Sequence, residues 1–256
     1  MKLLFPLPDR DFDVTEVAVP WKLLVCAGHE PIFATEAGAT PAADPLLLTG
    51  VIFGQLGAAP EPKAFYAEMI ESESFRRPRR WVDIDPLEFD GLWLAGGHAP
   101  GMKQYLGSPT LQQKVAAFWA TGRPVAAICH GVLVLARTRG PDGRSVLYGR
   151  RTTCLPKYME RSAYLLTAWR LGRYYRTYDT YVEDEVRAAL AAASDFERGP
   201  RTIARRGSAS DDRPAFVVEH GRYLSARWPG DSYLLAKRMI RLVEGERRDT
   251  AGTPAQ

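Results

Sequence analysis

One apolar segment that runs directly into a cysteine constrains the fold of this chain most. Pro124–Ile128 is short and fully apolar, which is typical of a strand buried on both faces of a parallel sheet. Cys129 follows at once, and a helical pattern occupies His130–Arg137. A strand, a reactive residue and a helix in this order predict a nucleophile elbow above the carboxyl ends of the strands. The sequence therefore predicts an α/β protein with Cys129 as its nucleophile.

The remaining pattern predicts a single α/β domain. The chain has 256 residues, of which 46% are hydrophobic and 25% charged, enough for one large domain. The order of apolar segments predicts strands at Lys2–Pro8, Glu30–Thr35, Gly91–Ala95, Val146–Leu155, Ala215–Glu219 and Arg222–Ala226. It predicts helices at Val14–Ala27, Pro62–Phe75, Thr110–Thr121, Tyr181–Ala193 and Asp231–Gly245. We expect one domain over residues 1–246, with a cap-like insertion at about 38–86, and a disordered tail over 247–256.

Charge and apolar patterning exclude several classes of function. The net charge is only +4, from 34 basic and 30 acidic side chains, and the arginine clusters lack a nucleic-acid-binding motif. We therefore expect no nucleic-acid partner. No apolar run approaches the roughly 18 residues of a membrane span, and the first residues do not form a signal peptide. No membrane partner is expected, and the expected location is a reducing cytoplasm.

The cysteines and histidines are too few and too scattered for a structural metal or a disulfide framework. The chain has three cysteines, Cys26, Cys129 and Cys154, and four histidines. No pair of cysteines has the spacing of zinc ligands, so no metal site is predicted. Cys26 and Cys154 are expected in the core. Cys129 is expected on an exposed turn at a helix N-terminus, which favours the reactive thiolate.

Several motifs resemble those of the PfpI/ThiJ superfamily, which has a class I glutamine amidotransferase-like fold. The elbow Ala127–Gly131, the upstream segment Asp90–His98 and the early segment Glu16–Pro20 occur in the family's order. Phe216–Arg222 and the final helix fit the family's last hairpin and helix, so the resemblance spans about residues 2–245. The Cys-His elbow, the Gly-Gly-His turn and the insertion are most similar to the heat-shock chaperone/glyoxalase III branch. The resemblance implies a flavodoxin-like parallel-sheet sandwich without a cofactor, and we expect a homodimer.

The resemblance also implies roles for the residues around Cys129. Glu16 matches the family glutamate that hydrogen-bonds the nucleophile, and a carboxyl there can act as acid and base. His130 matches the base of this branch. Its backbone N–H, one residue past the nucleophile, is expected to form an oxyanion hole with the N–H of Gly97 or His98.

A third group is expected to orient His130. The family uses an Asp or Glu after the next strand, and Glu160 is our candidate, with Asp179 as the second choice. The segment from Tyr158 to Tyr178 departs from the family pattern through its many aromatic and basic residues.

The elbow and the resemblance predict an enzyme that acts on a small carbonyl compound. We expect a glyoxalase III-like lyase that converts a 2-oxoaldehyde to a 2-hydroxy acid. Another hydrolase or hydratase reaction of the same cysteine is an alternative, as is a redox-sensing holdase chaperone without turnover. Glutaminase activity is not expected, because the resembling amidotransferases need a late His-x-Glu pair, whereas His220 is followed by Gly221-Arg222.

Overall fold

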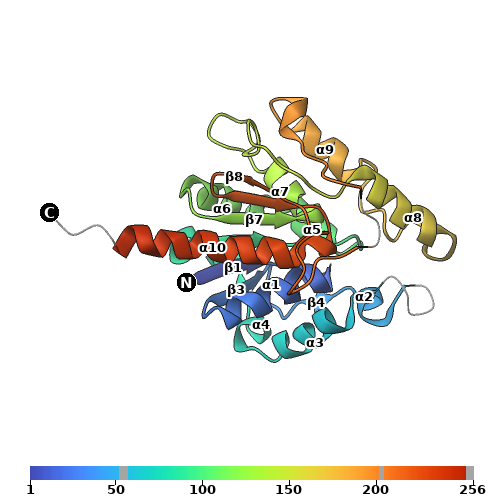
Figure 1. The fold of residues 1–256 in the computed structure, drawn as a ribbon, viewed down its shortest axis with the longest axis horizontal. Coiled ribbons are helices and arrows are strands. Elements are labelled where there is room, and N and C mark those ends of the chain that lie inside the picture. The colour runs from blue at the N-terminus through green and yellow to red at the C-terminus, as the bar shows by residue number, and fades with distance from the viewer. Residues whose placement is uncertain (52–56, 202–204, 252–256) are drawn as a thin grey trace.

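A seven-stranded sheet organises the computed structural model, which describes residues 1–51, 57–201 and 205–251. The strand order is β5-β3-β1-β6-β7-β9-β8, parallel except for β8, which runs antiparallel to β9. These strands are β1 (Lys2–Pro6), β3 (Glu30–Thr35), β5 (Arg79–Arg80), β6 (Gly91–Leu94), β7 (Val125–Ile128), β8 (Val217–His220) and β9 (Tyr223–Ala226). With helices around this sheet, the predicted flavodoxin-like α/β fold is confirmed (Figure 1).

Helices cover the sheet, and two of them lie at one end of the molecule. They are α1 (Val14–Cys26), α2 (Pro45–Thr49), α3 (Pro60–Met69), α4 (Glu73–Arg76), α5 (Met102–Gly107), α6 (Pro109–Ala120), α7 (Val132–Arg137), α8 (Lys157–Leu171), α9 (Val182–Ala188) and α10 (Ser232–Ala251). Helix α1 packs against α3 and α10, whereas α7 packs against α5, α6 and α9. Helices α8 and α9 contact each other and lie together at one end of the molecule, at the upper right of Figure 1.

The central strands are buried because their side chains are apolar on both faces. Every residue of β6 and β7 is buried, as expected for the middle of a two-sided parallel sheet. Phe5 of β1 stacks on Trp93 of β6 with the ring centroids 5.8 Å apart, and the edge of the Phe33 ring packs against it. Such aromatic pairs add to the free energy gained from burial alone. The core therefore fixes the strand ends from which the elbow emerges.

The insertion at about 38–86 is part of the main domain. Strand β5 within it adds an edge to the large sheet, and β4 (Ala42–Ala43) pairs with β2 (Arg10–Phe12). Helix α3 packs on α1. Residues 60–76, which we predicted as one helix from Pro62 to Phe75, form α3 and α4. Residues 52–56 of the insertion lie outside the described part of the chain.

The structure departs from the sequence predictions in three further segments. Val146–Leu155 forms turns with a single isolated bridge, between Thr152 and Phe196, because β7 already pairs with β6 and β9 on its two sides. The sequence analysis predicted no helix or strand for the aromatic and basic segment from Tyr158 to Tyr178, whereas most of α8 lies there. At the other end of the chain, α10 runs to Ala251, so residues 247–251 of the predicted disordered tail are helical, and 252–256 lie outside the described residues.

Among the described residues, none of the helices combines the length and the apolar character needed to cross a membrane.

Candidate active site

Cys129 occupies a sharp turn between β7 and the helix that follows. Its φ is 58°, in the left-handed region that residues other than glycine rarely adopt. One turn of 3-10 helix, Cys129–Gly131, then leads into α7. A Cβ atom on Gly131 would lie 2.2 Å from the carbonyl oxygen of Leu94, so only glycine fits where the elbow crosses β6. The strained backbone and the close approach of the two strands confirm the nucleophile elbow.

Helix α1 brings Glu16 to the elbow. The Asp13 carboxylate caps α1 by accepting hydrogen bonds from the N–H groups of Thr15 and Glu16, at 2.8 and 3.1 Å. Glu16 Oε2 in turn accepts a hydrogen bond from Gly96 N–H at 2.7 Å. A Cβ atom on Gly96 would lie 2.9 Å from both Glu16 Oε2 and Cys129 Cβ. The absence of a side chain at Gly96 therefore lets the Glu16 carboxyl group lie close to Cys129, the residue with which the resemblance pairs it.

Burial keeps both partners of this pair protonated. Glu16 is fully buried, and its pKa is raised well above its usual range by burial and by the charge of Asp13. Burial, together with Glu16, also raises the pKa of the Cys129 thiol. The other carboxyl oxygen of Glu16, Oε1, is buried and has no hydrogen-bond partner among the described residues. The prediction of an exposed thiolate was therefore wrong: the thiol is 1% exposed, and burial outweighs the opposing hydrogen bond from the His130 backbone.

The imidazole of His130 links the thiol to a residue that the sequence analysis missed. Nδ1 lies 3.5 Å from Cys129 Sγ, and Nε2 lies 3.4 Å from Thr177 Oγ1. The Thr177 hydroxyl donates its own proton to the carbonyl oxygen of His98 at 2.7 Å, so it is an acceptor for Nε2–H. This tautomer leaves Nδ1 unprotonated beside the thiol. Burial lowers the pKa of His130 well below its usual value, so the ring is a neutral base at rest.

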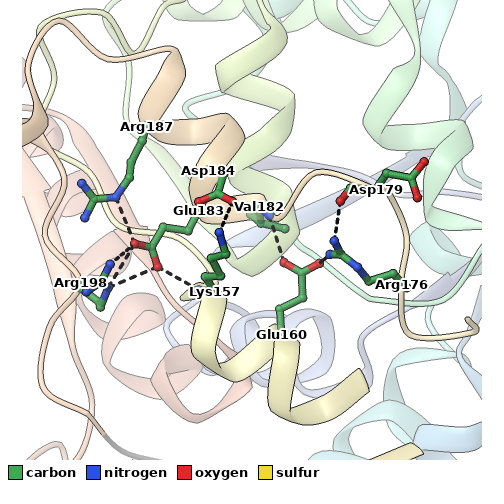
Figure 2. Close-up of polar contacts among 9 residues, drawn as sticks. All are labelled: Lys157, Glu160, Arg176, Asp179, Val182, Glu183, Asp184, Arg187 and Arg198. Carbon is green, nitrogen blue, oxygen red and sulfur yellow. Dashed lines mark hydrogen bonds and ion pairs between the residues drawn. The ribbon is translucent and has the colours of Figure 1, made fainter. Parts of the chain in front are cut away.

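Neither acidic candidate orients His130. Glu160 is 1% exposed and accepts hydrogen bonds from Arg176 at 2.7 Å and from Val182 N–H at 3.0 Å, as Figure 2 shows. The exposed Asp179 pairs with Arg173 instead. Glu160 instead holds Arg176, the neighbour of Thr177 in the chain. No sequence signal marked Thr177, a single hydroxyl 47 residues beyond His130.

Two of the three N–H groups predicted for an oxyanion hole, those of Gly97 and His98, lie in the turn before α5, and the third is the N–H of His130 on the elbow. Gly96 N–H is occupied by Glu16, whereas no hydrogen bond among the described residues uses the N–H of Gly97 or His98. The His98 ring packs edge-on against His130 with the centroids 4.6 Å apart. Burial lowers the pKa of His98 to about 4, so this ring is neutral as well. The ligand atoms of His98, Cys129 and His130 lie within 4.8 Å of one another, a grouping that could hold a metal ion and that cysteine spacing did not predict.

Two adjoining cavities of about 170 and 190 Å³ lie on the outer side of His98. They share six lining residues: His98, Ala163, Leu166, Arg206, Trp228 and Pro229. Neither Cys129 nor His130 lines either cavity. His98 therefore forms part of the wall between the cavities and the nucleophile, and a substrate that enters here must displace its side chain.

The other cysteines do not belong to the site. Cys26, the last residue of α1, is exposed and not in the core as predicted, because it lies on the outer face of the helix end. Cys154 is buried as predicted, but in irregular chain and not in a strand.

Replacing His98 by alanine should accelerate the alkylation of Cys129. In the native protein we expect iodoacetamide to label the exposed Cys26 first, because Cys129 is a buried thiol with a raised pKa. Removing the His98 ring opens the wall and admits water, which lowers the pKa of Cys129 and gives the reagent access. Time-resolved peptide mapping of His98→Ala against wild type measures both rates. The rate of labelling at Cys26 is the internal control. An unchanged rate at Cys129 would contradict the conclusion that His98 shields the nucleophile.

The fold and the site together define an α/β protein with a cysteine nucleophile elbow. Comparison with known proteins then identifies the family. A family model described as ThiJ/PfpI family-like matches residues 7–200, so this chain belongs to the ThiJ/PfpI family.

Relatives within the family carry glyoxalase and deglycase names. Uncharacterized protein C14C4.04 of Schizosaccharomyces pombe is 30% identical over 95% of this chain and 84% of that protein. Glutathione-independent glyoxalase hsp3101 of the same yeast is 38% identical, over only 27% of this chain and 30% of its own length. The crystal structure of glyoxalase III from Candida albicans has the same fold, with a TM-score of 0.66, 20% identity and coverage of 94% of this chain and 97% of that one.

Proposed function

We propose that this protein converts a 2-oxoaldehyde to a 2-hydroxy acid without glutathione. The observation that carries the proposal is the arrangement of His130, whose Nδ1 faces the Cys129 thiol while its Nε2 is held by Thr177. A neutral base beside a neutral thiol can take up the thiol proton when sulfur attacks a carbonyl carbon. The names of the relatives, glyoxalase and deglycase, support carbonyl chemistry of this kind.

The proposed reaction begins with addition of the thiol to the aldehyde. Sγ forms a bond to the aldehyde carbon, the C=O pair of electrons moves to oxygen, and the thiol proton passes through His130 to that oxygen, which gives a hemithioacetal. His130 then removes the remaining hydrogen of this carbon as a proton, and its bonding electrons form a C=C bond while the neighbouring carbonyl becomes an enolate oxygen. The proton of the hemithioacetal hydroxyl moves to that oxygen. His130 then returns its proton to the neighbouring carbon as the C=O of the first carbon re-forms, which produces a thioester of the 2-hydroxy acid. Water cleaves the thioester, regenerates the thiol and releases the acid, so the balance is one 2-oxoaldehyde plus one water per hydroxy acid.

The surroundings of Cys129 suit the charge that develops in this sequence. The N–H groups of Gly97 and His98 are the proposed donors to the carbonyl oxygen, where negative charge accumulates. Because its pKa is raised, Glu16 is a proton donor to sulfur and can stabilise the thiolate when the thioester breaks. A thiol with a raised pKa reacts slowly with peroxide, so the protonation state of Cys129 favours turnover over a redox-sensing chaperone.

The direct test of the proposed function is conversion of methylglyoxal to lactate by the purified protein, followed by NMR. We expect lactate without added glutathione, since Cys129 supplies the thiol within the protein. Cys26→Ser is a matched control, because Cys26 lies on the surface at the end of α1. No lactate from the wild-type protein at concentrations far above that of the enzyme would overturn the glyoxalase proposal.

A further inference from the structure

We propose that Arg206 and Trp228 bind a carboxylate on the substrate, so that the preferred 2-oxoaldehydes carry an acidic group beyond an apolar spacer. That the substrate is an oxoaldehyde rests on the proposed function. That it carries a carboxylate rests on the cavities outside His98 and can be tested without turnover.

The cavities are larger than a three-carbon aldehyde requires. Their volumes are about 170 and 190 Å³, whereas a water molecule takes up about 30 Å³ in the liquid. Ala163 and Leu166 of α8 and Pro229 supply apolar walls to both cavities. Leu166 is also 56% exposed, so it lies at the rim where a ligand enters. This lining suits a short hydrocarbon chain between two polar ends.

Two residues with hydrogen-bond donors line both cavities. Arg206 lines both cavities, and its guanidinium lies 5.1 Å from the centroid of the Trp228 ring. The hydrogen bonds and ion pairs recorded among the described residues include none made by Arg206. Trp228 Nε1 is buried and has no hydrogen-bond partner within that same part of the chain. The indole N–H can only donate, and a buried donor without an acceptor is costly. A carboxylate would accept from both groups, and arginine binds it with particular strength.

Trp228 is held in a fixed position, which a specific binding site requires. Its neighbour Arg227 and Asp231 form an ion pair in which both side chains are fully buried. Asp231 also accepts a hydrogen bond from Arg227 N–H at 3.1 Å and donates its own N–H to the Trp228 carbonyl oxygen at 2.9 Å. The turn that carries the indole is therefore tied to the start of α10, and little ordering entropy is lost when a ligand binds.

The charges around Arg206 leave it available to an anion. Asp13 lines the cavity of about 170 Å³, but its carboxyl group already caps α1. Burial raises the pKa of Asp13 to about 6 despite the nearby Arg206. On the outer side, Arg206 shares a hollow with Arg205, Asp211 and Arg213. Asp211 is engaged by two hydrogen bonds from the side chain of Arg213. The hollow outside Arg206 is thus positively charged, which attracts an anionic substrate.

The test compares 4,5-dioxopentanoate, which has a carboxylate two methylene groups from the oxoaldehyde, with its neutral methyl ester. We expect kcat/KM for the acid to exceed that for the ester by about 10- to 100-fold, the range of one charge-assisted hydrogen-bonded contact. In Arg206→Gln this ratio should fall to about one. Arg213→Gln is the matched control and should keep the ratio of the wild type, because Arg213 lines only the outer hollow.

A binding measurement separates this inference from the proposed function. Cys129→Ser should bind the unreactive ketone 4-oxopentanoate, detected by calorimetry or by tryptophan fluorescence, and Arg206→Gln in that background should weaken binding by a similar factor. If no oxoaldehyde is consumed but this binding depends on Arg206, the proposed function fails and the carboxylate site stands. If Arg206→Gln changes neither the substrate ratio nor this binding, the carboxylate site is wrong.

Discussion

Replacing Cys129 by serine is expected to reduce methylglyoxal turnover to the level of the uncatalysed reaction. A hydroxyl group is a far weaker acid than a thiol, and the base beside it is a neutral imidazole whose pKa is lowered by burial. Serine is nearly isosteric with cysteine, and residue 129 has a strained backbone with φ at 58° that a larger change would disturb. NMR of lactate formation measures the loss, and circular dichroism and thermal unfolding show whether the fold is retained.

The same experiment distinguishes a nucleophile from a buried core residue. Cys154 is buried like Cys129 but lies in irregular chain away from the elbow. Cys154→Ser should therefore lower the free energy of unfolding and leave the kcat of the folded protein close to the wild-type value. Equal turnover by wild type and Cys129→Ser would show that the elbow thiol is not the reacting group.

Replacing His130 by glutamine is expected to lower kcat by about 10²- to 10⁴-fold, the usual contribution of a general base. The His130 ring is the only imidazole within hydrogen-bond reach of Cys129 among the described contacts, with Nδ1 3.5 Å from Sγ. Because substrate binding does not need this base, kcat should fall much more than KM changes. Thr177→Val is the matched control: it keeps the base and removes the hydroxyl that accepts from Nε2–H and donates to the His98 carbonyl oxygen, so its loss should be smaller.

The pH dependence of the wild-type activity checks the protonation state of the base. His130 acts only when neutral, and burial lowers its pKa well below the usual value near 6.5. Activity should therefore persist as the pH falls through 6.5 and decline only at lower pH, where the ring gains a proton. Stability has the same sign: the folded protein holds a neutral imidazole and the unfolded chain a protonated one, so stability is lost as pH falls below the unfolded pKa. If activity falls to half its maximum at pH 6.5 or above, the pKa of His130 is not lowered and the base is not buried as described.

Local patterns in the sequence determined the elbow and most of the sheet. The apolar segment before Cys129 can only be buried on both faces, and the residues that follow can only form a helix, so a sharp turn at the cysteine was required. Glu16 was identified by the resemblance of Glu16–Pro20 to a family motif, and the role of Gly96 in bringing Glu16 to the elbow appeared only in the structure. The elbow and the strands depend on neighbours in the chain, and periodicity records such neighbours directly.

Only the tertiary structure decided how the site is charged and which group completes it. Cys129 sits at a helix start, which favours a thiolate, but the packing of α1 and of the His98 turn buries it, and burial raises its pKa. Glu160 has the residue type expected of a catalytic acid, yet Arg176 and Val182 N–H take both of its oxygens. Thr177 reaches His130 because α8 and α9 bring that segment over the elbow. Burial and long-range pairing are properties of three-dimensional packing, and for this reason no local pattern in the sequence recorded them.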